Sequence, residues 1–199
     1  MFYEPSRRDH GLPHDPLKAI VAPRPIGWIS TLSPEGTPNL APYSFFNLVS
    51  ENPSILAFSS DGWKHSVSNI RDSGEFVWNL ATHDLMEQVN LTSKPIGPEE
   101  SEFDLAELDT APCRLVKPPR VAASPAALEC VLIEIIEIKD RHGRWSGRLL
   151  TLGEIVGVHL DERYIEDGLV RTERLQPLAR AGYFDYGWTD KVRSIPRPK

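Results

Sequence analysis

The sequence is poor in cysteine, with only Cys113 and Cys130 in 199 residues, and these two do not form a C-x-x-C pair. The segment after Met1 also lacks the apolar stretch of a secretory leader. Long apolar runs are missing as well, since none approaches the roughly 20 residues that a membrane helix requires. These absences predict a reduced protein of the cytoplasm with no membrane segment.

An excess of positive charge is also lacking. The chain has 22 Lys and Arg residues against 28 Asp and Glu residues, which gives a net charge of −6. This balance attracts neither nucleic acid nor an anionic lipid surface, so neither is expected as a partner. The basic residues at the end of the chain, within 188–199, are interpreted as part of a loose, solvated tail.

Several catalytic and metal-binding motifs are absent. His10 and His14 are the one H-x-x-x-H pair among the six histidines, and no metal site is expected. No G-x-S-x-G motif surrounds a serine, which argues against a hydrolase. The phosphate-binding loops G-x-G-x-x-G and G-x-x-x-x-G-K-[ST] are missing too. The carboxylate pairs Glu99–Glu100 and Glu134–Glu137 are interpreted as solvated surface.

What the sequence does have is a series of β-strand patterns. A chain of 199 residues that is 40% hydrophobic is long enough for one domain, taken as 1–199, with its own core. Strands are predicted at 26–31, 54–60 and 75–81, and two long β-rich runs flank the turn segment 141–147 as a hairpin. Because strands outnumber crossover helices, the pattern predicts a mainly β, antiparallel barrel with capping helices.

Helices are predicted in two places between these strands. One lies within 63–74 and ends at Gly74, and the other covers 82–93 with Thr82 as its N-cap. The stretch 94–127 contains six prolines and is predicted to be an irregular excursion that forms a lid or covers a sheet edge.

The segment "SSDGWKHSVSN", residues 59–69, is the best candidate for an anion site. It follows a predicted strand, carries hydroxyl groups at Ser59 and Ser66, and places Lys64 at a predicted helix start. Free N–H groups and the positive end of the helix dipole favour a phosphate at such a position. The alternative remains open, because serines commonly cap helices and a surface lysine is ordinary.

A second candidate segment is "APYSFFNLVS", residues 41–50. Its aromatic residues Tyr43 and Phe45 are compatible with an ordinary core. However, Ser44 and Asn47 place hydrogen-bonding groups next to this aromatic wall. That mixture of apolar surface and polar groups also suits a planar heterocycle.

Together these segments resemble the flavin reductase-like, FMN-binding split-barrel family, over about residues 15 to 187. The resemblance rests on "PRPIGWISTLSPEGTPNLAPYSFFN", "SS" ahead of "KHSVSNI", "GEFVWNLA", "GEIVGVHLDE" and "PLARAGYFDY". It implies an antiparallel split β-barrel that forms a homodimer and binds FMN non-covalently near the dimer interface. Many members of the family are reduced by NADH or NADPH.

The resemblance also implies roles for particular residues. The isoalloxazine and ribityl parts of FMN would be held by Asn39, Tyr43, Ser44, Phe45 and Asn47, with Arg24 on the adjoining strand edge. The phosphate would be held by Ser59, Lys64 and Ser66. Further contacts are expected from Lys94 in the excursion and from Tyr183 near the C-terminus. Where many relatives have Lys-Asp-Thr, this chain has Lys64-His65-Ser66, which keeps a hydroxyl but changes the charge beside the phosphate.

The function that follows is an NAD(P)H-dependent flavin reductase that passes electrons to free flavin, oxygen or a partner oxygenase. Hydride transfer to a flavin requires no acid or base from the protein, so no side chain is assigned a catalytic role. The alternative is a non-enzymatic flavin-binding module for electron transfer or storage. It is favoured if the excursion 94–127 covers the flavin face that a hydride donor must reach.

Overall fold

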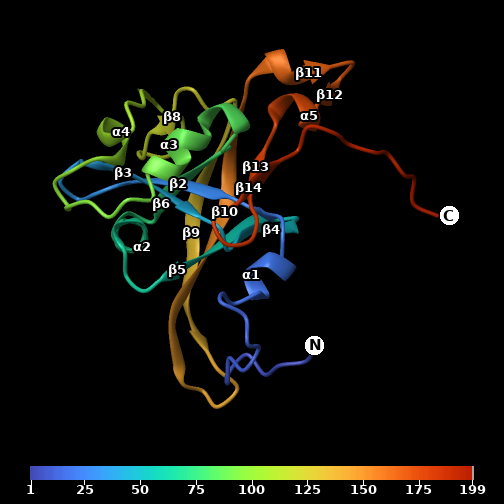
Figure 1. Ribbon diagram of the computed structural model, residues 1–199. Coiled ribbons are helices and arrows are strands. Elements are labelled where there is room, and N and C mark those ends of the chain that lie inside the picture. The colour runs from blue at the N-terminus through green and yellow to red at the C-terminus, as the bar shows by residue number, and fades with distance from the viewer. Residues whose placement is uncertain (199) are drawn as a thin grey trace.

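The computed structural model describes residues 1–198 (Figure 1). Its main sheet has seven strands in the order β3-β2-β6-β9-β10-β5-β4, and every neighbouring pair is antiparallel. The bounds of these strands are β2 (Gly27–Leu32), β3 (Pro38–Tyr43), β4 (Phe46–Glu51), β5 (Ser54–Asp61), β6 (Glu75–Asn79), β9 (Ala126–Lys139) and β10 (Trp145–Leu160). The predicted strands 26–31, 54–60 and 75–81 are therefore confirmed as β2, β5 and β6.

The sheet forms an incomplete barrel because its two edges meet at only one end. The edge strands are β3 and β4, and no hydrogen-bonded ladder joins them. In the sequence, however, only residues 44–45 separate the end of β3 from the start of β4. The sheet must therefore curl until its edges come together at this link, which leaves an open seam between them.

The long hairpin predicted around 141–147 is confirmed as β9 and β10. These strands extend well beyond the rest of the sheet (Figure 1). Register shifts interrupt their pairing at three places: between Trp145 and Arg148, between Leu152 and Gly153, and between Ile155 and Gly157. Such bulges bend a strand and increase its twist, so they allow two long strands to follow the curve of the barrel.

The inner face of the curved sheet holds the first hydrophobic core, against which α2 (His65–Ser73) packs. Phe58 and Phe76 meet edge to face in this core, with ring centroids 5.8 Å apart. A Cβ atom at Gly153 would lie 2.3 Å from Cζ of Phe76, so no side chain fits there. Gly74 ends α2 in the left-handed conformation, with a φ of 73°, as the sequence predicts.

A second core covers the outer face of β2 and is closed by short helices. These helices are η1 (His83–Leu85), α3 (Met86–Leu91) and α4 (Glu102–Leu105). Trp28, which is fully buried, donates a hydrogen bond from Nε1 to Oγ1 of Thr92 at 2.9 Å. Thr82 takes the predicted N-cap position, ahead of η1, but its side chain makes no capping bond; its extended backbone forms a β-bridge with Pro177.

The excursion 94–127 is more ordered than the sequence predicts. Besides α4 it contains the short strands β7 (Thr110–Ala111) and β8 (Arg120–Val121), and it runs into the start of β9. Ser30 donates to the carbonyl oxygen of Pro119 at 2.6 Å, and the Val121 N–H donates to Oδ1 of Asn79 at 2.8 Å. These bonds fasten much of the excursion to the outside of the barrel.

The remaining elements lie at the ends of the chain. They are α1 (Leu17–Ile20), β1 (Arg24–Pro25), η2 (Glu162–Tyr164), β11 (Ile165–Glu166), β12 (Leu169–Val170), α5 (Thr172–Leu175), β13 (Leu178–Arg180) and β14 (Tyr186–Trp188). Strands β1, β13 and β14 form a separate small sheet. Residues 191–198 are exposed and have no regular structure. No helix within residues 1–198 is both long and apolar enough to cross a membrane.

Candidate functional site

A cavity of about 620 Å³ lies beside the seam of the barrel, where residues 44–45 connect β3 to β4. Strands β3 and β5, the start of α2, the segment after α3 and the helix α1 all contribute to its wall. The residues that line it are Lys18, Asn39, Ala41, Pro42, Tyr43, Ser44, Phe45, Ser59, Asp61, Trp63, Lys64, His65, Ser66, Thr92, Ser93, Lys94, Pro95, Ile96, Glu102 and Arg148.

Eight of the eleven residues singled out in the sequence come together around this cavity. They are Asn39, Tyr43, Ser44, Phe45, Ser59, Lys64, Ser66 and Lys94. The other three lie outside its lining. Arg24 is buried and donates to backbone carbonyl groups, Asn47 is exposed on β4, and Tyr183 lies in an exposed turn with its ring 5.6 Å from that of His14.

Two hydroxyl groups in the wall of the cavity lack a well-aligned partner among residues 1–198. The Tyr43 phenol and the Ser59 hydroxyl are both buried and make no hydrogen bond of ordinary geometry, although the hydroxyl groups of Ser60 and Ser66 lie close to the phenol. A buried polar group without a partner costs about 1–3 kcal/mol, so unpartnered groups that line a cavity point to a ligand. Tyr43 is only 8% exposed, which makes it the stronger of the two indications.

Burial raises the pKa of the Tyr43 phenol above its ordinary value. The nearby hydroxyl groups of Ser66 and Ser60 act in the opposite direction, and the charge of Glu102 adds to the increase. The phenol is therefore protonated at neutral pH and offers an O–H donor to a ligand.

The start of α2 forms the anion-binding part of the wall. Lys64 takes the N-cap position, and the first turn has no side-chain cap. The first N–H groups of a helix have no partner within the helix, and the dipole makes this end positive. Ser66 is held in place by Asn39, whose Nδ2 donates to the serine Oγ at 3.0 Å. A phosphate group placed here would meet N–H groups, a hydroxyl and an ammonium.

Glu102 introduces a buried carboxyl group next to this region. It is 5% exposed, and its Oε2 accepts a hydrogen bond from the Leu40 N–H at 2.9 Å. Burial raises the pKa of Glu102, whereas this bond, its own N–H and the charge of His65 oppose the increase. His65, the residue at which the sequence departs from the Lys-Asp-Thr pattern, lines the same wall.

Lys18, Asp61 and Arg148 line the cavity but were not predicted from the sequence to be part of the site. Arg148 belongs to β10 and reaches the cavity because it pairs with Asp61 of β5 in the ladder between these strands. Such a register is a tertiary feature that no local pattern reveals. Trp63 lies inside the quoted segment 59–69, but the sequence alone does not show that half of its surface is exposed.

A second group of titratable side chains lies on the outside of the barrel. Cys113, Glu129 and His159 have ligand atoms within 4.8 Å of one another. Both oxygens of Glu129 are already engaged: Oε1 accepts from the Arg114 N–H and contacts His159 Nε2 at 2.5 Å, and Oε2 accepts from the N–H groups of Leu115 and Val116. Burial raises the pKa of Cys113 to about 11, so its sulfur is a thiol at neutral pH. This group is arranged as a hydrogen-bonded clamp on residues 114–116.

Comparison with known proteins adds to this geometry. The family described as flavin reductase like domain matches residues 21–178. An uncharacterized protein of Halalkalibacterium halodurans is 34% identical over 187 residues, which is 92% of this chain and 89% of that protein. Nitrilotriacetate monooxygenase component B of Bacillus cereus superposes with a TM-score of 0.89 and 26% identity, over 98% of each chain. The 2-nitrobenzoate 2-nitroreductase NbaA of Pseudomonas fluorescens gives a TM-score of 0.86 and 28% identity, over 100% of this chain and 96% of that one. The expected split-barrel fold is confirmed.

Proposed function

The chain belongs to the flavin reductase like domain family, and from this premise we propose that the cavity beside the barrel seam binds FMN. The phosphate would lie at the start of α2, held by Lys64 and Ser66, and the ring system would lie against the wall that ends in Ser44 and Phe45. A cavity of about 620 Å³ falls in the size range of cofactor sites.

The observation that carries this proposal is the group formed by Ser59, Lys64 and Ser66 in the cavity wall, at a start of α2 that has no side-chain cap. A flavin has an edge of hydrogen-bonding groups and two apolar faces. Tyr43 and Ser59 would satisfy polar groups of the ligand, and Ala41, Pro42 and Phe45 would contact its apolar surface. The same ligand therefore accounts for the cationic helix start, the unpartnered hydroxyl groups and the apolar wall.

The proposed activity is NAD(P)H-dependent flavin reduction, with electrons passed on to free flavin, oxygen or a partner oxygenase. Bound FMN would supply two-electron redox chemistry between a dihydronicotinamide donor and an acceptor. The residues of this chain bind and orient the ligands. The similarity to a monooxygenase component and to a nitroreductase supports this activity over a passive carrier.

Anaerobic mixing of the FMN-loaded protein with NADH, and separately with NADPH, tests the activity. We expect the flavin absorbance in the visible to bleach rapidly with at least one donor. If neither donor bleaches the flavin, although dithionite still reduces it, the proposed reductase activity is wrong. The alternative, a flavin-binding module for electron transfer or storage, then remains.

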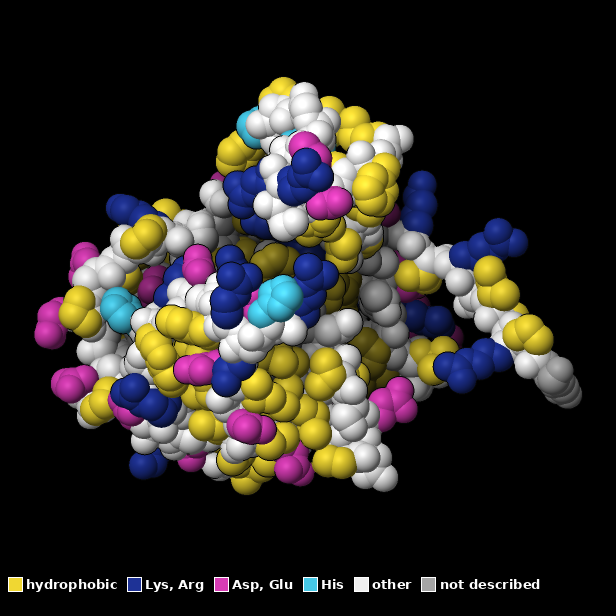
Figure 2. Space-filling model, turned by 90° about the horizontal axis from the view of Figure 1, so that it is seen from below, with side chains coloured by type: hydrophobic (Ala, Val, Ile, Leu, Met, Phe, Trp, Pro, Cys, Tyr) yellow, Lys and Arg dark blue, Asp and Glu magenta, His cyan; other side chains and the backbone are white. Residues whose placement is uncertain are grey.

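We also propose a symmetric homodimer. Large apolar side chains are exposed on the edge strand β4 and along β9 and β10, which is unusual for a monomer in water. They are Leu48, Val49, Val131, Ile133, Val156 and Val158. Figure 2 shows hydrophobic side chains gathered on the face seen from the hairpin end.

Sedimentation of the FMN-loaded protein at micromolar concentration should therefore give twice the chain mass of 22.4 kDa. Val158 is 69% exposed and belongs to this apolar set. Val158→Asp is expected to shift the protein toward the monomer, because the dimer would then bury an unpaired charge in its interface. A monomeric wild-type protein would contradict the dimer.

A further inference from the structure

Two carboxyl groups line the cavity, and they lie in different surroundings. The Asp61 side chain is 67% exposed and forms an ion pair with Arg148 at 3.8 Å. Glu102 is 5% exposed and takes part in no ion pair within residues 1–198. A buried carboxyl group without a cationic partner is stabilised in its neutral, protonated form, because burial disfavours the charge. Glu102 is therefore the carboxyl group of this wall that favours a bound proton.

This carboxyl group lies next to the anion-binding part of the wall. Glu102 is the first residue of α4, which lies beside β3 (Figure 1). Its Oε2 accepts a hydrogen bond from the Leu40 N–H at 2.9 Å. Leu40 follows Asn39, whose Nδ2 donates to Oγ of Ser66 at 3.0 Å. Two consecutive residues of β3 thus connect the carboxyl group to the serine at the start of α2.

The Glu102 carboxyl group has capacity for a further hydrogen bond. Its Oε2 accepts from the Leu40 N–H, its own N–H lies close by, and no side chain of residues 1–198 donates to it. A protonated carboxyl group has one O–H donor in addition to its acceptor capacity. With Oε2 bonded to the backbone, Oε1 can carry this proton and donate it to a ligand in the cavity. An ionised phosphate oxygen is a strong acceptor for such a donor.

The charges of the wall determine when Glu102 binds a proton. Burial raises the pKa of Glu102, and the Leu40 N–H, its own N–H and the charge of His65 oppose this increase. The other charged or titratable groups that line the cavity or lie within two residues of Glu102 are Lys18, Tyr43, Asp61, Lys64, Lys94, Arg148, Glu100 and Asp104. A phosphate bound at the start of α2 adds negative charge, so it raises the pKa of Glu102 further.

We propose that Glu102 takes up one proton from solvent when FMN binds, and that the neutral carboxyl group donates a hydrogen bond to the phosphate. This inference rests on the proposed function, because it requires the FMN phosphate at the start of α2. Proton uptake and FMN binding then favour each other by linkage. FMN affinity is expected to fall as the pH rises through the window between the pKa of Glu102 in the free protein and its higher pKa in the complex. Because burial already raises the pKa in the free protein, this window begins above the ordinary value of a carboxyl group.

Calorimetric titration with FMN in pairs of buffers of different ionisation enthalpy counts the protons taken up, from about pH 5.5 to 8.5. Glu102→Gln keeps an oxygen acceptor for the Leu40 N–H but cannot ionise. We expect the wild-type protein to take up as many as about one proton per FMN more than this variant within that range. The Kd of the wild type for FMN should also increase at least about fivefold more than that of the variant over about two pH units.

Two controls separate the phosphate from other causes. Asp104→Asn removes an exposed carboxyl group from the same helix and should take up as many protons as the wild type does. Riboflavin lacks the phosphate, so the wild type and Glu102→Gln should take up equal numbers of protons when they bind it.

Equal proton uptake by the wild type and Glu102→Gln at every pH would overturn the role of Glu102 and leave FMN binding intact. A difference of the same size with riboflavin would also overturn it, because the proton would then not depend on the phosphate. If Glu102→Gln does not fold, the wild type alone decides. Ionisation of the FMN phosphate next to Lys64 releases protons, so net uptake with FMN but not with riboflavin comes from the protein, and its absence would contradict the proposal. A wild-type protein that binds neither flavin would remove the proposed function itself.

Discussion

Replacing Lys64 with Gln is expected to weaken FMN binding by about 10- to 100-fold, because a charge-assisted bond to phosphate contributes about 1.5–3 kcal/mol. Riboflavin has the same ring and ribityl chain but no phosphate, so its affinity should not change. Titration of each flavin with the protein, followed by flavin fluorescence, measures both constants. The ratio of the two affinities isolates the phosphate contribution.

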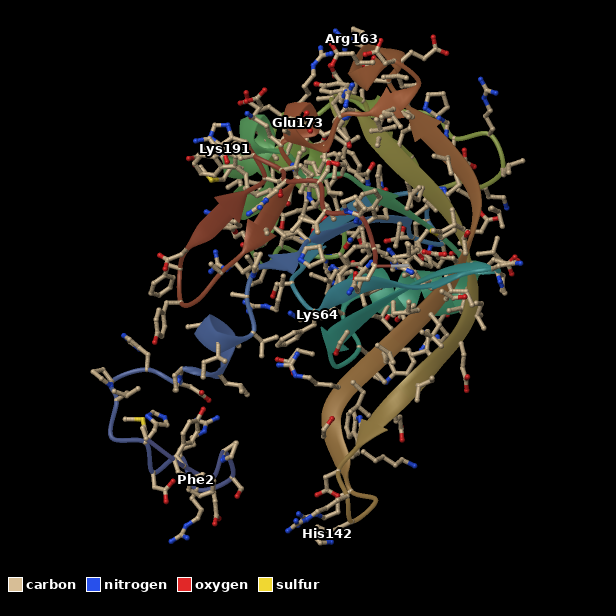
Figure 3. The ribbon with its side chains drawn as sticks, turned by 90° about the vertical axis from the view of Figure 1, so that its right-hand side faces the viewer. Phe2, Lys64, His142, Arg163, Glu173 and Lys191 are labelled. Atoms are coloured by element: carbon tan, nitrogen blue, oxygen red, sulfur yellow. The ribbon has the colours of Figure 1, made fainter. Side chains whose placement is uncertain are left out.

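Lys191→Gln is a suitable control for this experiment. It removes the same charge from the exposed C-terminal segment (Figure 3) and should leave both affinities at their wild-type values. An equal loss of FMN and riboflavin affinity in Lys64→Gln would exclude Lys64 from the phosphate site. It would indicate instead that the substitution disturbs the start of α2 as a whole.

Glu129→Ala is expected to destabilise the protein by about 2–3 kcal/mol, because it leaves the buried Val116 N–H and two partly buried N–H groups without an acceptor. Glu129 is 1% exposed and accepts hydrogen bonds from three backbone N–H groups, besides its contact with His159. Urea unfolding followed by circular dichroism gives the difference in the free energy of unfolding. A decrease in the free energy of unfolding of less than about 1 kcal/mol is typical of an exposed position. Such a result would contradict the role of Glu129 in holding residues 114–116.

The clamp also predicts how stability depends on pH. Burial alone would raise the pKa of Glu129, but the N–H groups of Arg114 and Leu115, then His159 and the N–H of Val116, outweigh it and lower the pKa. A carboxyl group with a lowered pKa in the folded state stabilises the protein above its unfolded pKa of about 4.3. That contribution is lost as the pH falls through the folded pKa.

Glu129→Gln isolates this titration, because the amide keeps the shape of the side chain and cannot ionise. The stability difference between wild type and Glu129→Gln should be largest at pH 6–7 and should shrink below about pH 4. Urea midpoints measured at several pH values from 7 to 3 supply the comparison. A difference that stays constant over this range would show that the charge of Glu129 contributes nothing.

Features of the fold that depend on local sequence were predicted well. The strands β2, β5 and β6, the long hairpin and the end of α2 at Gly74 all follow from nearby alternation or turn residues. The N-cap position of Thr82 was also predicted, but not the absence of its side-chain bond or the β-bridge to the distant Pro177. Short-range patterns do not contain such pairings.

The same distinction applies to the candidate site. Segments 39–45 and 59–66 are continuous in sequence and carry their polar groups together, so they were identified before the fold was known. Arg148 and Lys18 reach the cavity only through a cross-strand register and through the bonds of Arg24. Arg24 itself was expected to contact the cofactor. In the structure its Nη1 and Nη2 groups donate to backbone carbonyl groups, and its buried Nε has no partner among residues 1–198, so Arg24 helps to form the frame around the site.

The most direct test of the FMN site is the thermal unfolding transition of the apoprotein with and without FMN. A ligand that binds only the folded state stabilises it by about 2.7 kcal/mol at 100 times its Kd. For a chain of this size that corresponds to an increase in Tm of about 5–10 °C. We predict this increase with FMN and a smaller one with riboflavin at the same concentration. An unchanged Tm at millimolar FMN would contradict the proposal that the cavity at the barrel seam is a flavin site.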